Sequence, residues 1–465
     1  IKAMKSKVLL IRANPTDMEN TRLPESLAKA LGFVPPLGLA SVAGFLREHG
    51  VEVDVLDAQA EQMDLAQIRR RMEEYEPTIV GLTCMTPTVH DDFDVAGAAK
   101  ELGATTVIGG PHADAMPEET IERPEVDFVV IGEGEEPMFR LVEAIEGDLK
   151  FEDVPGLVFH NQEGKVHMNE GHLHPELDEL PYPAYDLLPF KRYGSIITKD
   201  RLSTICPGRG CPFKCGFCFK LTSDKSIRFR SPESVAEELE YVVNEFGVNE
   251  INFVSDTLTL KKTFIFPFCE EIIRRNIKIS WVAPTRADCV SLEMLKLMKK
   301  AGCRSLRFGV ETGSDKIIKL LDKSLTKERA KKAFKWAKEA EIESFAYFIL
   351  GYIGETDKTV QETLDFVREL SPDLLMYNAA TPLPSTRLFE QSIEAGLVEP
   401  DYWKKFVRDR NTPRISYLHP KTEEWIKKAY RQFFFRPSFV FNQILQTRPS
   451  NISSNIRAFR GLTGL

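Results

Sequence analysis

The N-terminal third of the chain alternates short apolar runs with longer stretches of helical periodicity. Five runs rich in β-branched residues have the length of buried strands: VLLIRA (8–13), VEVDVL (51–56), TIVGLT (78–83), TTVIGG (105–110) and DFVVIG (127–132). Strands that alternate with helices form parallel sheets covered on both faces. We therefore expect an α/β, doubly wound, Rossmann-like domain over residues 1–147.

The alternation stops over residues 148–193 and resumes over residues 194–395. The first stretch contains a candidate hairpin, VPGLVFHNQEGKVHM, and the segment PYPAYDLLPF, whose prolines are typical of a linker. The second contains six apolar runs separated by amphipathic segments such as TKERAKKAFKWAKEA. Six strand–helix units predict a partial (β/α)6 barrel instead of the full eight. Residues 396–465 are expected to form a helical, aromatic and basic C-terminal region.

Length and composition are those of a multidomain globular protein. The 465 residues are 43% hydrophobic and 28% charged. No apolar run reaches the roughly 20 residues that a membrane span needs. The first residues, IKAMKSKVLLIRANP, lack the features of a secretory signal. We expect a cytoplasmic protein with no nucleic-acid partner.

The C-terminal region carries an unusual charge. From Trp403 onward there are 13 Lys/Arg and 3 Asp/Glu, in a chain of net charge −8. These basic residues could complement the acidic body or face an anionic partner such as a membrane surface. The run AYRQFFFRPSFVFNQILQTRPS (429–450) interleaves aromatic and basic residues. We favour a helix that caps the barrel with its aromatics. The alternatives are a cover over the active-site mouth, peripheral membrane contact, and contact with an anionic or apolar substrate.

Four of the eight cysteines lie in the stretch CPGRGCPFKCGFC (206–218). Cys211, Cys215 and Cys218 have the spacing C-x3-C-x2-C, and no second pair completes a structural zinc site. Thiolates this close on one loop suit an iron–sulfur cluster. Three ligands for four irons leave one iron open to another ligand.

This triad, with Phe217 before its last cysteine, resembles the radical SAM superfamily. The resemblance implies a 4Fe–4S cluster whose open iron chelates S-adenosylmethionine (SAM). It also implies an external electron donor of the flavodoxin or ferredoxin type, and reductive cleavage of SAM to a 5′-deoxyadenosyl radical. Cys206 is interpreted as a small buried hydrophobe, with a fourth cluster ligand as the alternative. The remaining cysteines are expected in the core: Cys84, Cys269, Cys289 and Cys303.

Polar residues and a glycine at the expected barrel strand ends also resemble SAM-binding positions of that superfamily. Ser255 and Asp256 lie in NFVSDTLT, and Arg286 lies in APTRAD. Glu311 lies in FGVETGS, and Gly351 lies in FILGYIGE. The resemblance implies that Arg286 pairs with the SAM carboxylate and that Gly351 lies against adenine. Each charged residue could instead be an ordinary salt-bridge partner.

The expected N-terminal domain resembles the cobalamin-binding domain of B12-dependent radical SAM enzymes. Thr83 in GLTCM stands where that family places a hydroxyl near the dimethylbenzimidazole, and Gly109 and Gly110 would let the nucleotide tail pass. His112 could contact the corrin or its tail, or be a plain turn histidine. RANPTDMENTR lacks the cobalt-binding Asp-x-His-x-x-Gly motif, so the lower face of cobalt would be free or weakly ligated. A nucleotide or substrate module without cobalamin is the alternative.

The chain is therefore identified as similar to cobalamin-dependent radical SAM enzymes of the anaerobic Mg-protoporphyrin monomethyl ester cyclase and hopanoid methylase type. This resemblance implies transfer of a methyl group from methylcobalamin to an unactivated carbon of a small-molecule, lipid or tetrapyrrole-like substrate. The alternative is an oxidative cyclisation or rearrangement without methyl transfer. A methylthiotransferase is disfavoured because the N-terminal domain has only Cys84. A non-catalytic cobalamin or metal-binding sensor is the alternative of another class. No side chain is identified as a catalytic acid or base.

Overall fold

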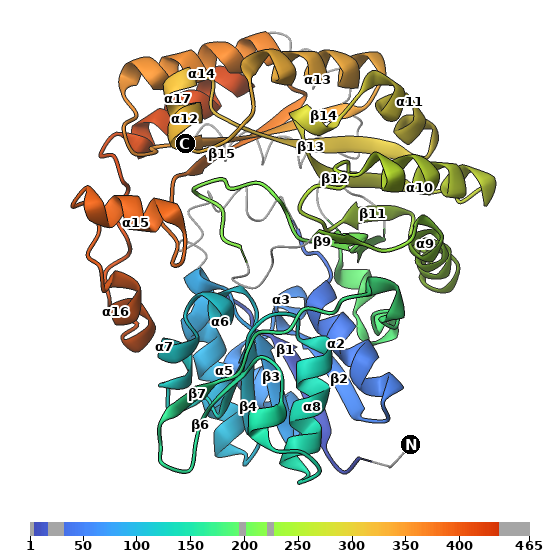
Figure 1. The fold of residues 1–465 in the computed structure, drawn as a ribbon, viewed down its shortest axis with the longest axis vertical. Helices are drawn as coiled ribbons and strands as arrows, with labels where there is room; N and C mark the ends of the chain where they lie inside the picture. Colours follow the sequence, from blue (N-terminus) through green and yellow to red (C-terminus); the bar gives the residue numbers. More distant parts are fainter. Residues whose placement is uncertain (1–3, 17–31, 195–200, 221–226, 437–465) are drawn as a thin grey trace.

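The computed structural model describes residues 4–16, 32–194, 201–220 and 227–436. Two α/β layers face each other in Figure 1, with the N-terminal layer below and the barrel layer above. Helices cover the two sheets differently. The lower sheet has helices on both faces, and the helices of the upper sheet lie on the side turned away from the N-terminal layer. The predicted fold class is confirmed.

The lower sheet has the strand order β2-β1-β3-β4-β5-β6-β7, and β1 to β5 are parallel. Its strands are β1 (Lys7–Arg12), β2 (Glu52–Asp57), β3 (Ile79–Thr83), β4 (Thr105–Gly109), β5 (Phe128–Val130), β6 (Leu157–His160) and β7 (Val166–Met168). Leu9 and Ile11 face a different core from Val8 and Leu10, as alternation along a doubly covered strand requires.

Helices cover both faces of this sheet. Their bounds are α2 (Leu37–Glu48), α3 (Ala58–Glu61), α4 (Leu65–Tyr75), α5 (Val89–Glu101), α6 (Pro111–Ala115), α7 (Pro117–Ile121) and α8 (Glu135–Ile145). Buried residues of α2 and α8 join one core, and those of α4 and α5 join the other. The fold therefore places the carboxyl ends of β1, β3, β4 and β5 along one edge, where such sheets bind ligands.

The stretch between the two layers does more than connect them. Its hairpin forms as expected, but β6 pairs antiparallel with β5, so the hairpin extends the lower sheet. The proline-rich segment after it packs into the junction. The Tyr185 hydroxyl donates to Glu238 Oε1 across 2.6 Å, and the Tyr193 hydroxyl donates to Asp57 Oδ2 across 2.8 Å. These bonds join the segment to both layers.

The upper sheet has the order β15-β14-β13-β12-β11-β8, and every pairing in it is parallel. Its strands are β8 (Leu202–Ile205), β11 (Glu250–Phe253), β12 (Ser280–Arg286), β13 (Cys303–Glu311), β14 (Glu343–Leu350) and β15 (Leu374–Ala379). The covering helices are α9 (Pro232–Phe246), α10 (Lys262–Arg274), α11 (Leu292–Lys300), α12 (Asp315–Leu320), α13 (Lys327–Glu339) and α14 (Asp357–Leu370). This is the partial six-stranded barrel that the sequence predicts.

Side-chain caps explain where several of these helices begin. Ser231 precedes α9, accepts a hydrogen bond from the Ser234 backbone N–H, and is followed by proline at the first helical position. Thr356 and Thr359 form a reciprocal capping box at the start of α14. The short antiparallel ribbon of β9 (Gly208–Arg209) and β10 (Arg228–Phe229) is absent from the sequence prediction.

The C-terminal region holds α15 (Arg387–Glu394), α16 (Tyr402–Arg408) and α17 (Thr422–Phe434). Trp425, Tyr430 and Phe433 of α17 are buried in the barrel core, which confirms the capping interpretation for this helix. Basic residues near α16 pair with carboxylates of the lower layer, as in Arg408–Glu122 at 2.8 Å. Residues 437–450 of the aromatic-basic run lie outside the described residues.

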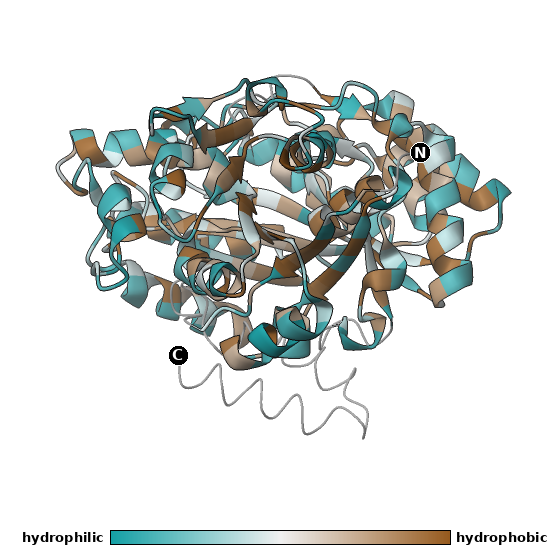
Figure 2. Ribbon diagram, turned by 90° about the horizontal axis from the view of Figure 1, so that it is seen from below, coloured by the Kyte–Doolittle hydropathy of each residue, from teal (hydrophilic) through white to brown (hydrophobic). Residues whose placement is uncertain are grey.

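Hydropathy follows this architecture. In Figure 2 the central strands are mostly hydrophobic, while the surrounding helices carry many hydrophilic residues. Among the described residues, no helix combines the length and apolar character needed to cross a membrane.

Candidate active site

A cavity of about 590 Å³ lies between the two layers, at the carboxyl edge of the lower sheet. This volume is within the 300–1,000 Å³ typical of pockets for small molecules and cofactors. The lower layer contributes the ends of β3, β4 and β5 and the first turns of α2 and α8. The upper layer contributes residues 206, 208–211, 218–220 and 254–256. Residues of both expected cofactor sites therefore line one space.

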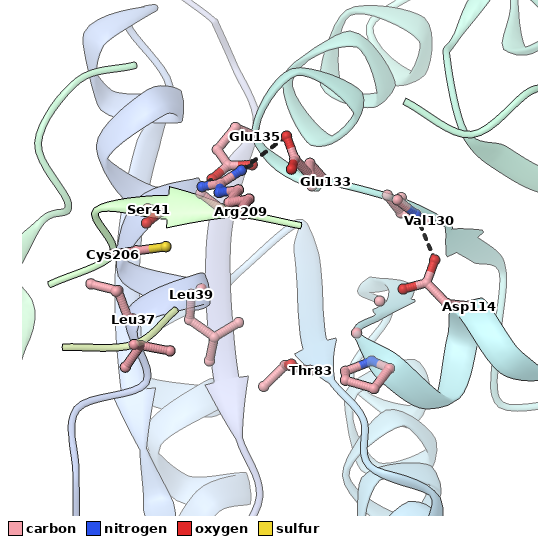
Figure 3. A pocket seen from close by; sticks show the side chains of 18 of the residues that line it. Leu37, Leu39, Ser41, Thr83, Asp114, Val130, Glu133, Glu135, Cys206 and Arg209 are labelled. Atoms are coloured by element: carbon pink, nitrogen blue, oxygen red, sulfur yellow. Dashed lines mark hydrogen bonds and ion pairs between the residues drawn. The ribbon is translucent and has the colours of Figure 1, made fainter. Parts of the chain in front are cut away.

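The part of the cavity inside the lower layer is mainly apolar. Its aliphatic lining consists of Leu10, Leu37, Leu39, Val42, Leu82, Val107, Val130 and Met138. Leu37, Leu39, Thr83 and Val130 are labelled in Figure 3, together with Cys206 and Arg209 of the upper layer. A wall of this kind suits a ligand with a large apolar surface.

The three clustered cysteines follow β9 on one loop. Cys211 and Cys218 line the cavity, and Cys215 lies on the side of Arg286 and Lys323. Backbone bonds hold the loop: Cys218 N–H donates to Cys215 O across 3.1 Å, and Gly216 N–H donates to Leu321 O across 2.9 Å. The first bond closes a turn within the loop, and the second attaches the loop to the end of α12.

Two cationic side chains, each paired with a carboxylate, lie near Cys215. Arg286 Nη1 lies 4.0 Å from its Sγ, and the guanidinium lies 3.5 Å from the centre of the Phe213 ring. Burial raises the pKa of Cys215, and nearby Lys323 and Arg286 lower it. Burial, with Cys215 and other acidic neighbours, raises the pKa of Cys218 to about 11. These cations would stabilise an anionic group bound by the thiolates.

The donor set fits an iron–sulfur cluster by its chemistry: three thiols on one loop, two of them open to a cavity and one beside two cations. Within the described residues, no three His, Cys, Asp or Glu side chains form a group that could hold a single metal ion. The assignment of Cys211, Cys215 and Cys218 as cluster ligands accordingly remains a prediction.

Lys323 and Glu311 form a buried ion pair beside this loop, which the sequence interpretation missed. Lys323 Nζ lies 2.6 Å from Glu311 Oε1 and donates to Gly309 O across 2.9 Å. Glu311 has a φ of 71°, in the left-handed region that non-glycine residues rarely adopt. In the sequence, the available indication of this buried pair was Lys323 among the leucines of KLLDKSL.

The other expected SAM residues differ in their surroundings. Ser255 and Asp256 line the cavity, and the buried Ser255 Oγ has no hydrogen-bond partner among the described residues. Burial raises the pKa of Asp256. Phe217 packs half-buried against an apolar cluster that includes Leu321 and Tyr352. The unpaired Ser255 hydroxyl is the strongest sign of a missing ligand among these residues.

Arg286 was expected to pair with the SAM carboxylate, and in the structure it pairs with Asp288. Its Nε and Nη2 donate to the two carboxylate oxygens across 2.9 and 2.8 Å. The Nη1 group remains directed at Cys215 Sγ. The contact of Arg286 with SAM stays a prediction.

Gly351 has a structural reason to be glycine. Its φ is +81°, and a Cβ there would collide with the side chain of Thr422 in α17. Glu355 stabilises the same turn by accepting the Tyr352 N–H across 3.2 Å, and burial raises the pKa of Glu355 to about 7. The C-terminal helix therefore contacts the strand end assigned to adenine.

The expected cobalamin residues are mostly brought together. Thr83, Gly109 and Gly110 all line the cavity. Gly110 has a φ of +93°, and a Cβ there would lie 2.8 Å from Thr83 Oγ1. His112 does not line the cavity; it is fully buried, its Nδ1 lies 3.1 Å from Thr86 Oγ1, and burial lowers its pKa to about 3. Its Nε2 is buried without a hydrogen-bond partner among the described residues, and its expected contact with the corrin or its tail stays a prediction.

An ion-pair network at the junction was also missed by the sequence interpretation. Arg209 lies 2.6 Å from Glu135 Oε1 and 3.1 Å from Glu133 Oε2, and Arg228 lies 2.7 Å from Glu133 Oε1. Both glutamates follow β5 of the lower layer, and both arginines belong to the β9–β10 ribbon. Figure 3 shows Arg209 reaching Glu135 at the rim of the cavity. We call these four residues the junction network.

The remaining cysteines agree only in part with their expected core positions. Cys84, Cys269 and Cys303 are buried. Cys289 is not a core residue; it is half-buried, with Sγ 3.8 Å from Asp288 Oδ1. Cys206 follows β8 directly and lines the cavity, and its Sγ contacts Gly208 O at 3.4 Å.

The family models match both layers. A B12 binding domain matches residues 26–142, and the radical SAM superfamily matches residues 205–367. An uncharacterized methyltransferase of Pyrococcus horikoshii is 33% identical over 434 residues, covering 92% of this chain and 93% of its own length. The anaerobic magnesium-protoporphyrin IX monomethyl ester cyclase of Cereibacter sphaeroides is 31% identical over 421 residues, covering 88% and 68%.

A solved structure shares the fold. The radical S-adenosylmethionine methyltransferase TsrM of Kitasatospora setae, with cobalamin and a [4Fe-4S] cluster bound, has a TM-score of 0.70 at 19% identity. The match covers 85% of this chain and 79% of that one. At this coverage the likeness is one of overall fold.

Proposed function

This chain belongs to the cobalamin-dependent radical SAM enzymes, and from that premise we propose that it transfers a methyl group to an unactivated carbon. The observation that carries the proposal is the shared cavity. Cys211 and Cys218 line it from one side, and Thr83, Gly109 and Gly110 line it from the other. A methyl donor and a hydrogen-abstracting cofactor must reach the same substrate, and a single space between two cofactor domains suits that requirement.

The cofactors of the enzyme are a 4Fe–4S cluster, SAM and cobalamin, which supply radical generation and a transferable methyl group. We assign Cys211, Cys215 and Cys218 to the cluster, and support comes from their common loop and the cations beside Cys215. We assign Ser255 and Asp256 to SAM because both line the cavity next to Cys218, and because the Ser255 hydroxyl has no hydrogen-bond partner in the described part of the chain.

The chain's own residues would bind and orient the cofactors and would exclude water from the site. The buried ammonium of Lys323 and the Nη1 group of Arg286 lie near Cys215, where they can face an anionic ligand. The apolar wall of the lower layer keeps water from the space where the corrinoid would lie. Thr83 places its hydroxyl on that wall, and Gly109 leaves room beside it.

The substrate is a small molecule, and the reaction needs an external one-electron reductant; we propose a flavodoxin or ferredoxin for that role. A tetrapyrrole-like or lipid-like substrate is favoured because curated relatives include a magnesium-protoporphyrin ester cyclase and a hopanoid methylase. Contact of the tail with a membrane surface and a cytoplasmic location stay predictions.

Oxidative cyclisation is the second candidate, supported by the 31% identity to the cyclase. The experiment that separates the two reactions measures both SAM-derived products under reducing, anaerobic conditions with candidate substrates. Methyl transfer consumes SAM in two ways, so it yields S-adenosylhomocysteine and 5′-deoxyadenosine in about equal amounts. Cyclisation yields 5′-deoxyadenosine without S-adenosylhomocysteine, and that outcome would contradict the proposal.

A further inference from the structure

One arginine, Arg307 of β13, lies on the inner face of the barrel sheet. On β13, Leu306, Phe308 and Val310 pack into the core beneath the outer helices. Because side chains alternate along a strand, Arg307 lies on the opposite face, which is turned toward the lower layer. The parallel register places Pro284 and Phe345 directly beside Arg307.

Arg307 has little to compensate its charge. It is half-buried, and its Nη1 donates to Asn252 Oδ1 across 3.0 Å. Within the described residues it has no carboxylate at ion-pair distance. Its neighbours differ: Arg304 lies 2.6 Å from Glu250 and 3.5 Å from Glu343, and Arg286 is paired with Asp288. A partly desolvated guanidinium with free N–H groups favours an anionic partner.

The side chains around Arg307 are aromatic and apolar. Phe345 and Tyr347 are half-buried on the same face of β14, with ring centres 5.0 Å apart. Val254, which directly follows β11, is 45% exposed and also lines the shared cavity. This face therefore combines the Arg307 guanidinium with an apolar surface next to the proposed reaction space.

We propose that Arg307 binds a carboxylate or similar oxyanion of the substrate, whose apolar body lies against Phe345 and Tyr347. The inference rests on the proposed function and adds the substrate class, an organic anion with an apolar portion. SAM could supply the same carboxylate chemistry. Its expected site lies nearer the carboxyl ends of the strands, where Arg286 and Lys323 flank Cys215.

The first test uses benzoate as the probe and benzamide as its neutral counterpart, with the full chain and ligand-observed NMR. Benzoate should bind saturably to the wild type at millimolar concentration, and benzamide should bind about tenfold more weakly. This comparison needs no variant. Absence of saturable benzoate binding, or equal binding of the two probes, overturns the proposal.

The second test compares Arg307→Met with Arg274→Met. The latter removes the same charge from Arg274 on α10, whose side chain is 65% exposed and pairs with Glu271. Benzoate affinity should fall about tenfold in Arg307→Met, remain in Arg274→Met, and stay within about threefold in Arg307→Lys. Unchanged benzoate affinity in Arg307→Met overturns the assignment.

SAM titration of the same variants separates the two sources of the anion. SAM affinity should be equal in the wild type and Arg307→Met. A tenfold loss of SAM affinity would assign Arg307 to the cofactor and overturn the proposal. Failure of methyl transfer would instead appear as missing S-adenosylhomocysteine, with benzoate binding intact, so the two proposals fail in different ways.

Discussion

Arg209 and Glu135 form a 2.6 Å ion pair that joins the cluster loop to the lower layer. Arg209 stands two residues before Cys211, and Glu135 begins α8 at the rim of the shared cavity. The ion pair therefore links the two sides of the cavity on which the proposed cofactor sites lie. Glu133 contacts both Arg209 and Arg228, so each arginine of the junction network has a buried carboxylate partner.

Loss of the Arg209 charge should weaken the whole molecule. Among the described residues, Arg209→Met would leave buried Glu135 without its arginine partner and Glu133 with Arg228 alone. We expect a loss of about 3–5 kcal/mol in the free energy of unfolding. Lys296→Met removes one partner of an exposed pair with Glu339, 52% and 46% exposed, and should cost less than about 1 kcal/mol. Urea unfolding measures both, and equal losses would argue against the junction network.

The cysteine assignment predicts a sharp difference between neighbouring thiols. Replacing Cys211, Cys215 or Cys218 by alanine should remove most bound iron and abolish SAM cleavage, because each supplies one of three ligands. The Cys206→Ala protein should retain its bound iron, because Cys206 is not among the proposed cluster ligands. Iron analysis and EPR of the reduced protein measure the effect. Loss of iron in Cys206→Ala would make Cys206 a ligand.

The two adjacent glycines of the cavity should respond differently to alanine. Gly110→Ala places a Cβ 2.8 Å from Thr83 Oγ1 at a φ of +93°, and should cost about 1–3 kcal/mol of stability. At Gly109 the nearest atom to a Cβ is Val130 O at 3.6 Å, an ordinary contact. Gly109→Ala should keep the melting temperature of the cofactor-free protein and weaken corrinoid binding. Unchanged corrinoid affinity would remove Gly109 from the proposed site.

Two buried carboxyl groups should make stability depend on pH. Burial raises the pKa of Asp114 and of Glu355 to about 7, so both take up a proton on folding between about pH 4 and 7. The unfolded state binds fewer protons there, and these groups make stability fall as pH rises toward 7. His112, with its pKa lowered to about 3, acts in the opposite direction below about pH 6.5.

The variant Asp114→Asn/Glu355→Gln isolates the carboxyl contribution. Relative to wild type, it should gain at least about 1 kcal/mol of stability between pH 5 and pH 8, because neutral amides do not titrate. Urea midpoints at the two pH values give the difference, with the exposed Glu293→Gln as control. A variant that follows the wild-type pH dependence would show that these carboxyls are already ionised.

The strands were predictable because their signal is local. Each run of β-branched residues, such as TTVIGG, is long enough to show its buried character in the sequence itself. The β9–β10 ribbon was missed because each of its strands has two residues, too few to show any period. The pairing of β6 with β5 depends on a contact between segments, which periodicity does not encode.

The same distinction holds at the candidate site. The cysteine spacing lies within eight residues and was readable, whereas Arg209 and Glu135 are 74 residues apart. Lys323 becomes significant only when the fold places it against Glu311 and near Cys215. The burial of His112 follows from the way α6 packs after Gly110, which no motif specifies.

The most direct test of the account is the iron and corrinoid content of the protein purified without oxygen from cobalamin-fed cells. We predict about four irons and about one corrinoid per chain, as one cluster with three protein ligands and one cobalamin require. Four irons without corrinoid, after attempted reconstitution, would contradict the two-cofactor cavity and leave a radical SAM enzyme that works without cobalamin.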